Sequence, residues 1–219
     1  IDHKATSGMA LVMNPNTGEI LSIAHFPVLN PNTFSKYNKQ TWRNRAITDP
    51  FEPGSTMKIF LAAAALENNY CKPDSIFFCE NGNYRVDKDI IHDTHPYEWL
   101  SLSQIIRYSS NIGVTKVSEK IGKKVLYDML TSFGFGTKTD IECPGETSGI
   151  MSHYLRWSRI DTSAIAFGQG ISVSAVQLLT AASSIANGGL LMKPYLVKEI
   201  LDEDGNLIKR TNPVTIKRV

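Results

Sequence analysis

The segment from Phe51 to Asn69, FEPGSTMKIFLAAAALENN, constrains the fold more than any other part of the sequence. A Pro-Gly pair, which favours a turn, passes directly into an Ala-rich apolar run without a polar face. Such a run predicts a buried helix that ends near Asn68 and Asn69, because Pro73 prevents its continuation. With 219 residues the chain is long enough to build a core around this helix, as one large domain or two small ones.

The rest of the sequence predicts helices in the middle and β-hairpins towards both ends. Turn-forming residues separate the strand-like runs, and capping residues precede the helical ones. The predicted elements are a hairpin of Ser7–Asn14 and Glu19–His25, a helix capped by Ser101 and Gln104, a helix from Asn111 to Gly122, an apolar helix from Ser172 to Gly188-Gly189, and a hairpin from Tyr195 around Asp204-Gly205. This order of elements is typical of an α+β fold.

Ser55 and Lys58 stand at the start of the buried helix, where a long basic side chain is unexpected. Residues three apart share a helix face, so the Ser55 hydroxyl comes within reach of the Lys58 amine. A serine hydroxyl needs a base to become a good nucleophile, and burial against Ile59-Phe60-Leu61 lowers the pKa of a lysine enough for that task. The helix N-terminus also favours the negative charge of an attacked acyl group. From this motif alone a plainer interpretation remains open, in which Ser55 caps the helix and Lys58 extends to solvent.

A second motif, Ser109-Ser110-Asn111, lies on a short connection between two predicted helices, 54 residues after Ser55. Such a connection can aim side chains into a cleft, with Ser109 as a proton relay and Asn111 as the partner of a substrate amide. The same residues also suit an N-cap for the following helix, and the two roles are compatible. The presence of both motifs, each after suitable local structure, favours the catalytic interpretation.

Three segments, RAITDPFEPGSTMK, YSSNIGVTKV and FGQGISVSAVQLLTAASSIANGG, resemble the transpeptidase domain of class B penicillin-binding proteins, most closely the septal type that acts in bacterial cell division. The resemblance covers nearly the whole chain and implies a penicillin-binding protein/serine β-lactamase-like fold, with an antiparallel sheet and a helical lobe. It implies that Ser55 attacks the D-Ala-D-Ala carbonyl of a peptidoglycan stem peptide, with Lys58 as its base. Ser109 then passes the proton to the leaving amine, and Asn111 holds the substrate backbone.

The resemblance further implies that an amine on a neighbouring strand resolves the acyl-enzyme, and that β-lactam antibiotics acylate Ser55 as substrate mimics. It implies no metal or organic cofactor. The implied partners are membrane proteins of the division machinery, including a glycosyltransferase, and the implied location is the periplasmic side of the bacterial inner membrane. Because the chain begins at Ile1 and its longest apolar run is too short to span a bilayer, we expect a fragment whose anchor lies elsewhere. A net charge of +2 does not indicate a nucleic-acid partner.

The third motif of the family, K-T-G on a strand that lines the cleft, does not occur in this sequence. Lys138-Thr139-Asp140 is similar, but it lies in a Gly-rich stretch, and its aspartate would repel a substrate carboxylate. We therefore expect residues 1–219 to form a partial transpeptidase domain, inactive alone, with an incomplete sheet and an unpaired edge on the Ser7–His25 hairpin. A separate polypeptide, or a partner surface that pairs with the open edge, would supply the missing part. Two alternatives are a serine β-lactamase or D,D-carboxypeptidase and a non-catalytic β-lactam sensor or scaffold.

Two loop segments carry weaker signals. His92, Asp93 and His95 are of metal-ligating types, but no fourth ligand is evident, and a solvated loop is the better interpretation. The second segment is a long Asn/Pro-rich loop that contains Trp42, Arg43 and Arg45. These residues either shape the entrance of a cleft or anchor their own loop, and the sequence does not separate the two interpretations.

Cysteines and glycines complete the set of candidate residues. Cys71 and Cys79 either pair or remain thiols beside a free Cys143, and three buried thiols are the favoured interpretation. Gly168-Gln169-Gly170 precedes the apolar helix that follows Ser172, and we predict a role in backbone geometry rather than in catalysis.

Overall fold

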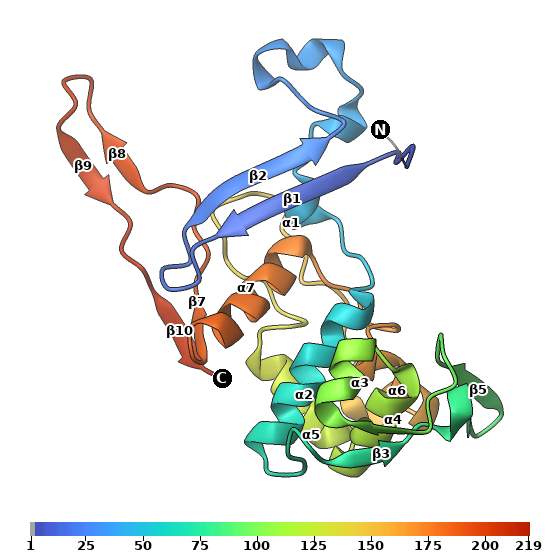
Figure 1. Ribbon diagram of the computed structural model, residues 1–219. Coiled ribbons are helices and arrows are strands. Elements are labelled where there is room, and N and C mark those ends of the chain that lie inside the picture. Colours follow the sequence, from blue (N-terminus) through green and yellow to red (C-terminus); the bar gives the residue numbers. More distant parts are fainter. Residues whose placement is uncertain (1–2) are drawn as a thin grey trace. The chain divides into compact units, whose positions relative to one another are not determined.

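The computed structural model describes residues 3–219, and these divide into two compact units. The terminal unit contains the chain up to Phe51 together with Phe133–Gly149 and Val173–Val219. The helical unit contains Glu52–Ser132 and Ile150–Ser172. Figure 1 shows helices and antiparallel strand pairs along the chain, which confirms the predicted α+β class.

The helical unit is built around α2 (Lys58–Glu67), the buried helix that the Ala-rich run predicts. Phe60, Leu61 and the alanines on the same face are shielded from solvent, where α4 and α5 pack against them. Helix α2 begins at Lys58 rather than at Ser55, because Gly54–Met57 form a tighter 3₁₀ turn. The remaining helices of this unit are α3 (Leu102–Tyr108), α4 (Asn111–Ile121), α5 (Lys123–Ser132) and α6 (Arg159–Ala166).

Local capping explains where these helices begin. The predicted capping box of α3 is present, since the Ser101 hydroxyl accepts the Gln104 N–H at 3.2 Å and the Gln104 side chain accepts the Ser101 N–H at 2.8 Å. Helix α4 ends at Gly122, as predicted. Two short antiparallel ladders complete the unit, β3 (Ile76–Phe78) with β6 (Trp99–Ser101) and β4 (Asn83–Val86) with β5 (Asp89–His92).

The terminal unit contains both predicted hairpins. In the first, β1 (Gly8–Met13) pairs with β2 (Ile20–Phe26), and in the second, β8 (Glu199–Leu201) pairs with β9 (Leu207–Arg210). The predicted apolar helix is α7 (Ala175–Ala186), which starts at Ala175 rather than at Ser172 because Ser174 caps it. The unit also contains α1 (Arg45–Thr48), β7 (Leu190–Met192) and β10 (Thr215–Arg218), the last two paired with each other.

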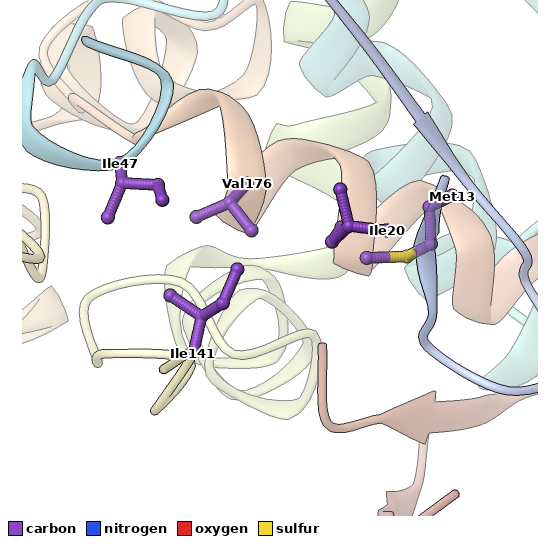
Figure 2. Close-up of a cluster of buried hydrophobic side chains, with 5 residues drawn as sticks. All are labelled: Met13, Ile20, Ile47, Ile141 and Val176. Atoms are coloured by element: carbon purple, nitrogen blue, oxygen red, sulfur yellow. The ribbon is translucent and has the colours of Figure 1, made fainter. Parts of the chain in front are cut away.

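Apolar side chains from four parts of the sequence form the core of the terminal unit (Figure 2). Met13 and Ile20 come from the first hairpin, Val176 from α7, Ile47 from α1 and Ile141 from the segment Phe133–Gly149. Met13 is the buried end of the strand face that also carries Met9 and Leu11. Met9 is exposed and Leu11 is half-buried, so only the Met13 end of this face packs in the core.

The described strands of residues 3–219 form only two-stranded ladders. Apart from one bridge between Glu19 and Tyr195, the described part of the chain places no third strand beside the β1–β2 hairpin. That a further polypeptide or partner surface pairs with this edge stays a prediction. Within the same described residues, no helix is both long and apolar enough to span a membrane.

Candidate active site

Ser55 lies in the 3₁₀ turn of Gly54–Met57, with its side chain exposed, one turn before the start of α2. The turn is held from outside by Gly168, whose carbonyl accepts the Gly54 N–H at 3.0 Å. Gly168 has a φ of +84°, and a Cβ at this position would lie 2.0 Å from the Gly54 carbonyl oxygen. Only glycine permits this approach, so the predicted backbone role of Gly168-Gln169-Gly170 is confirmed. Gly170 adds a hydrogen bond from its N–H to the Glu52 side chain at 2.9 Å.

Lys58 is the first residue of α2, and its side chain is 2% exposed. Its ammonium donates to three acceptors, the Ser109 carbonyl at 2.5 Å, the Ser109 hydroxyl at 2.9 Å and the Asn111 side-chain oxygen at 2.8 Å. Burial lowers the pKa of Lys58 to about 8, while the negative charge of Asp93 acts in the opposite direction. The alternative in which Lys58 extends to solvent is therefore wrong, and the pKa of this amine is closer to neutrality than that of an exposed lysine.

The second motif meets Lys58 because of the backbone geometry at the α3–α4 connection. Ser109 ends α3 in the left-handed conformation, with φ of 57° and ψ of 40°, and its side chain is exposed. Ser110 is the N-cap of α4 and accepts the Gly113 N–H at 2.8 Å. The N-cap interpretation is therefore confirmed for Ser110, while Ser109 and Asn111 contact Lys58.

Asn111 is the first residue of α4, and hydrogen bonds to both its side-chain oxygen and its side-chain nitrogen fix the orientation of the amide. The oxygen accepts from Lys58, and the amide nitrogen donates to the His92 carbonyl at 3.1 Å. A carboxamide nitrogen has two N–H groups, so one remains for a substrate carbonyl. The structure thus brings Lys58, Ser109 and Asn111 into direct contact next to the Ser55 turn. Their catalytic and substrate-binding roles stay predictions.

Asp93, which the sequence analysis considered only as a weak metal-ligand candidate in a solvated loop, is a residue of this site. Its carboxylate accepts from the Ser110 hydroxyl at 2.5 Å, from the Asn111 N–H at 2.5 Å and from the Ile112 N–H at 3.1 Å. His92 instead bonds through its ring to the Asn83 side chain at 2.8 Å. Within residues 3–219, no three His, Cys, Asp or Glu side chains converge as ligands for a metal ion. No local signal in the sequence links Asp93 to α4, because β6 and α3 lie between them in the chain.

Lys138-Thr139-Asp140 lies in an irregular segment of the terminal unit rather than on a strand. Thr139 is buried, and both its N–H and its hydroxyl donate to Glu146 at 2.6 Å. The Thr139 hydroxyl therefore stabilises its own loop through Glu146, which favours the rejection of this segment as a K-T-G motif.

The remaining candidates have structural contacts. Trp42 packs edge-on against Phe34 at 5.2 Å between ring centroids, and Arg43 and Arg45 both bond to Asp49 at 3.0 Å. These contacts favour the interpretation in which the three residues anchor their own loop. All three cysteines are free thiols; Cys71 and Cys79 are buried, whereas Cys143 is only partly so. Burial raises the pKa of each thiol, so none is activated as a nucleophile.

Comparison with known proteins identifies relatives of this chain. Residues 8–219 match the family model described as the penicillin binding protein transpeptidase domain. A probable peptidoglycan D,D-transpeptidase PenA from Neisseria flavescens is 33% identical over 217 residues, which cover 99% of this chain and 53% of that protein. The peptidoglycan D,D-transpeptidase FtsI of Escherichia coli is 36% identical over 188 residues, or 86% of this chain and 32% of that protein.

Solved structures give the same result for the fold. Penicillin-binding protein 3 of Mycobacterium tuberculosis, determined in complex with aztreonam, has a TM-score of 0.88 and 29% sequence identity. The match covers 97% of this chain and 48% of that structure. The predicted transpeptidase-type fold is therefore confirmed, and the chain spans about half or less of the length of these relatives.

Proposed function

Because the chain belongs to the penicillin-binding protein transpeptidase family, we propose that it supplies the nucleophile and base of a peptidoglycan D,D-transpeptidase. The observation that supports this proposal is the contact of the buried Lys58 amine with both Ser109 and Asn111, directly after the exposed Ser55. The pKa of Lys58 is lowered to about 8, which suits a general base for the Ser55 hydroxyl three residues earlier.

In the proposed first step, neutral Lys58 takes the proton of the Ser55 hydroxyl while Oγ attacks the carbonyl between the two D-alanines of a stem peptide. The C–N bond then breaks, and the leaving amine receives the proton from Lys58 through the Ser109 hydroxyl, with which Lys58 is hydrogen-bonded at 2.9 Å. The free N–H of the Asn111 amide donates to the substrate backbone. The N-terminus of α2 favours the negative charge on the attacked carbonyl.

In the second step an amine of a neighbouring stem peptide attacks the Ser55 ester. The ester C–O bond breaks, a new amide forms, and a proton returns to the Ser55 oxygen. β-Lactams would acylate Ser55 by the same attack, with the lactam C–N bond broken, and the structure of the tuberculosis relative was determined with aztreonam. The proposal assigns no residue of this sequence to the substrate carboxylate.

The relationship to FtsI and PenA also supports a proposal about context. We propose that the protein acts in septal cross-linking during cell division, with its catalytic domain on the periplasmic side of the inner membrane. Its partners there would include membrane proteins of the division machinery and a glycosyltransferase.

An acceptor-competition assay separates this function from the alternatives. The intact protein is incubated with a D-Ala-D-Ala stem peptide and a labelled amine acceptor, with Ser55→Ala as the control. Release of D-alanine with incorporation of the label is expected, and neither is expected for the control. Release without incorporation would identify a D,D-carboxypeptidase, and β-lactam turnover a β-lactamase. Stable drug binding without either reaction would identify a sensor or scaffold.

A further inference from the structure

Asp93 connects the β4–β5 hairpin to the proposed active site. It follows β5 directly, and its carboxylate faces the α3–α4 connection rather than solvent or substrate. We propose that Asp93 is a positioning residue, whose carboxylate fixes the Ser109–Asn111 connection so that both side chains remain on Lys58. The inference rests on the proposed function of Ser55 and Lys58, and it adds a residue outside the two motifs.

The first argument is the set of donors that the carboxylate satisfies. One oxygen accepts the N–H groups of Asn111 and Ile112, which begin α4 and have no partner within that helix. The other oxygen accepts the Ser110 hydroxyl, which itself accepts the Gly113 N–H. Hydrogen bonds to a charged acceptor are the stronger kind. The carboxylate therefore holds both the backbone and the cap of the motif in one orientation.

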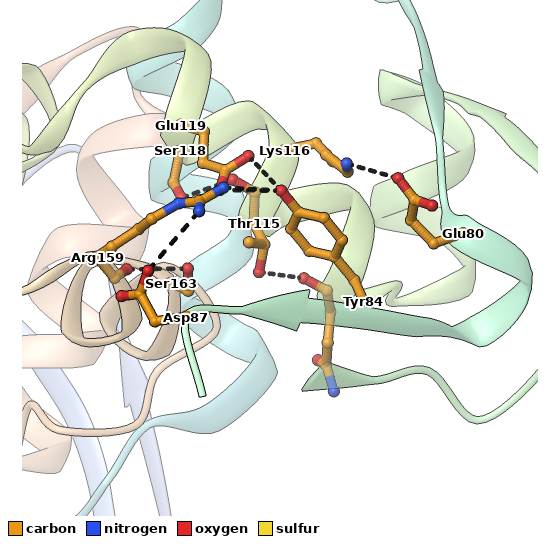
Figure 3. Close-up of polar contacts among 10 residues, drawn as sticks. Glu80, Tyr84, Asp87, Thr115, Lys116, Ser118, Glu119, Arg159 and Ser163 are labelled. Atoms are coloured by element: carbon orange, nitrogen blue, oxygen red, sulfur yellow. Dashed lines mark hydrogen bonds and ion pairs between the residues drawn. The ribbon is translucent and has the colours of Figure 1, made fainter. Parts of the chain in front are cut away.

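The second argument is the way in which the hairpin is held to the helices (Figure 3). The Tyr84 hydroxyl of β4 donates to Glu119 of α4 at 3.1 Å and accepts from Arg159 of α6 at 3.0 Å. The Lys116 ammonium lies 3.6 Å from the centre of the Tyr84 ring and bonds to Glu80 at 2.8 Å. Because Tyr84 joins the hairpin to α4 and α6, the hairpin holds Asp93 at the N-terminus of α4.

The third argument is electrostatic. Ser109 and Asn111, which contact the Lys58 amine directly, are uncharged, and Asp93 is the charged group that acts on its pKa. Its negative charge raises the pKa of Lys58 against the larger effect of burial. Removal of the charge with retention of the side-chain shape should therefore lower the pKa of Lys58. A residue with only a structural role would leave that pKa unchanged.

The test compares Asp93→Asn with Asp89→Asn in the intact protein. Asp89 provides a matched control, because it lies on the same hairpin with an exposed side chain. The Lys58 pKa is measured by titration of its ¹³Cε signal in ¹³C-lysine-labelled protein, with Lys58→Arg to assign the signal. We expect the Lys58 pKa to be lower in Asp93→Asn than in wild type, and to match wild type in Asp89→Asn. In Asp93→Asn, the pH below which penicillin acylation slows should also be lower than in wild type.

Asp93→Ala, which also removes the hydrogen bonds, should slow acylation about 10- to 100-fold on the pH plateau, with Asp93→Glu partly restoring the rate. If Asp93→Ala fails to fold, the titration of Asp93→Asn still decides the question. A Lys58 pKa in Asp93→Asn equal to that of wild type would overturn the inference, even if the rate falls. Absence of acylation in the wild type would refute the proposed function, while the titration would still test the role of Asp93.

Discussion

Substitution of Gly168 by alanine should damage the Ser55 turn from a position that is distant in sequence. With φ of +84°, alanine at this position adopts the left-handed conformation, which alone costs roughly 1–2 kcal/mol. Its Cβ would also lie 2.0 Å from the oxygen and 2.5 Å from the nitrogen of Gly54. Both are backbone atoms, so no rotamer change relieves the overlap, which typically adds about 1–3 kcal/mol. We expect Gly168→Ala to lower the free energy of unfolding by about 2–5 kcal/mol.

Gly188→Ala provides the control, since Gly188 also has a positive φ, of +83°, and nothing within 4 Å of its Cβ position. Urea unfolding of both variants should show a larger loss for Gly168→Ala, by about 1–3 kcal/mol. Penicillin acylation should slow only in Gly168→Ala, because only that change displaces the residue before Ser55. Equal stabilities of the two variants, or acylation of Gly168→Ala at the wild-type rate, would refute the proposed steric support.

Three further predictions concern Lys58, the hairpin anchor and the thiols. The pKa of Lys58 is lowered from 10.5 to about 8. Between these two values the unfolded state binds more protons than the folded state. The free energy of unfolding should therefore rise with pH across this range by about 3 kcal/mol relative to Lys58→Met. The same pH dependence of the free energy of unfolding in both proteins, measured by urea unfolding, would contradict this prediction. The acylation rate should fall below pH 8 as Lys58 is protonated, and Lys58→Arg should reduce it by about 10²–10⁴-fold at every pH. Tyr84→Phe should lower the melting temperature by removing the contacts to Glu119 and Arg159, and Tyr84→Ala should lower it further because Lys116 also loses the ring; equal melting temperatures for the two variants would show that the ring contributes nothing. Titration with Ellman's reagent under non-reducing denaturing conditions should detect all 3 cysteines, whereas a single reactive thiol would reveal a disulfide.

Much of the site could be predicted from the sequence because its signals are local. The Ser55–Lys58 spacing, the Ser101 capping box and the Asn111–Gly122 helix all depend on residues within one or a few turns of one another. The order of apolar and turn residues likewise indicated both hairpins. Lys58 in particular could be predicted to be buried, because the segment that follows it has no polar face.

Features that depend on contacts between distant segments could not be predicted in this way. Asp93 meets α4 through a carboxylate 18 positions before Asn111, and only the folded hairpin brings the two together. The contact of Gly168 with Gly54 likewise joins residues from two separate stretches of the helical unit. The acceptors of Lys58 depend on the left-handed backbone of Ser109, a conformation that a Tyr-Ser-Ser sequence does not indicate.

The most direct test of Ser55 as the nucleophile is intact-protein mass spectrometry after incubation with a penicillin. Wild type should gain the mass of one opened drug molecule, and peptide mapping should place it on Ser55. Ser55→Ala should gain none, and Thr56→Ala, which removes the neighbouring hydroxyl and its hydrogen bond to the Pro53 carbonyl, should gain the same mass as wild type. An adduct that persists in Ser55→Ala, or its absence from wild-type protein that carries the whole transpeptidase domain, would contradict the assignment of Ser55 and Lys58 as nucleophile and base.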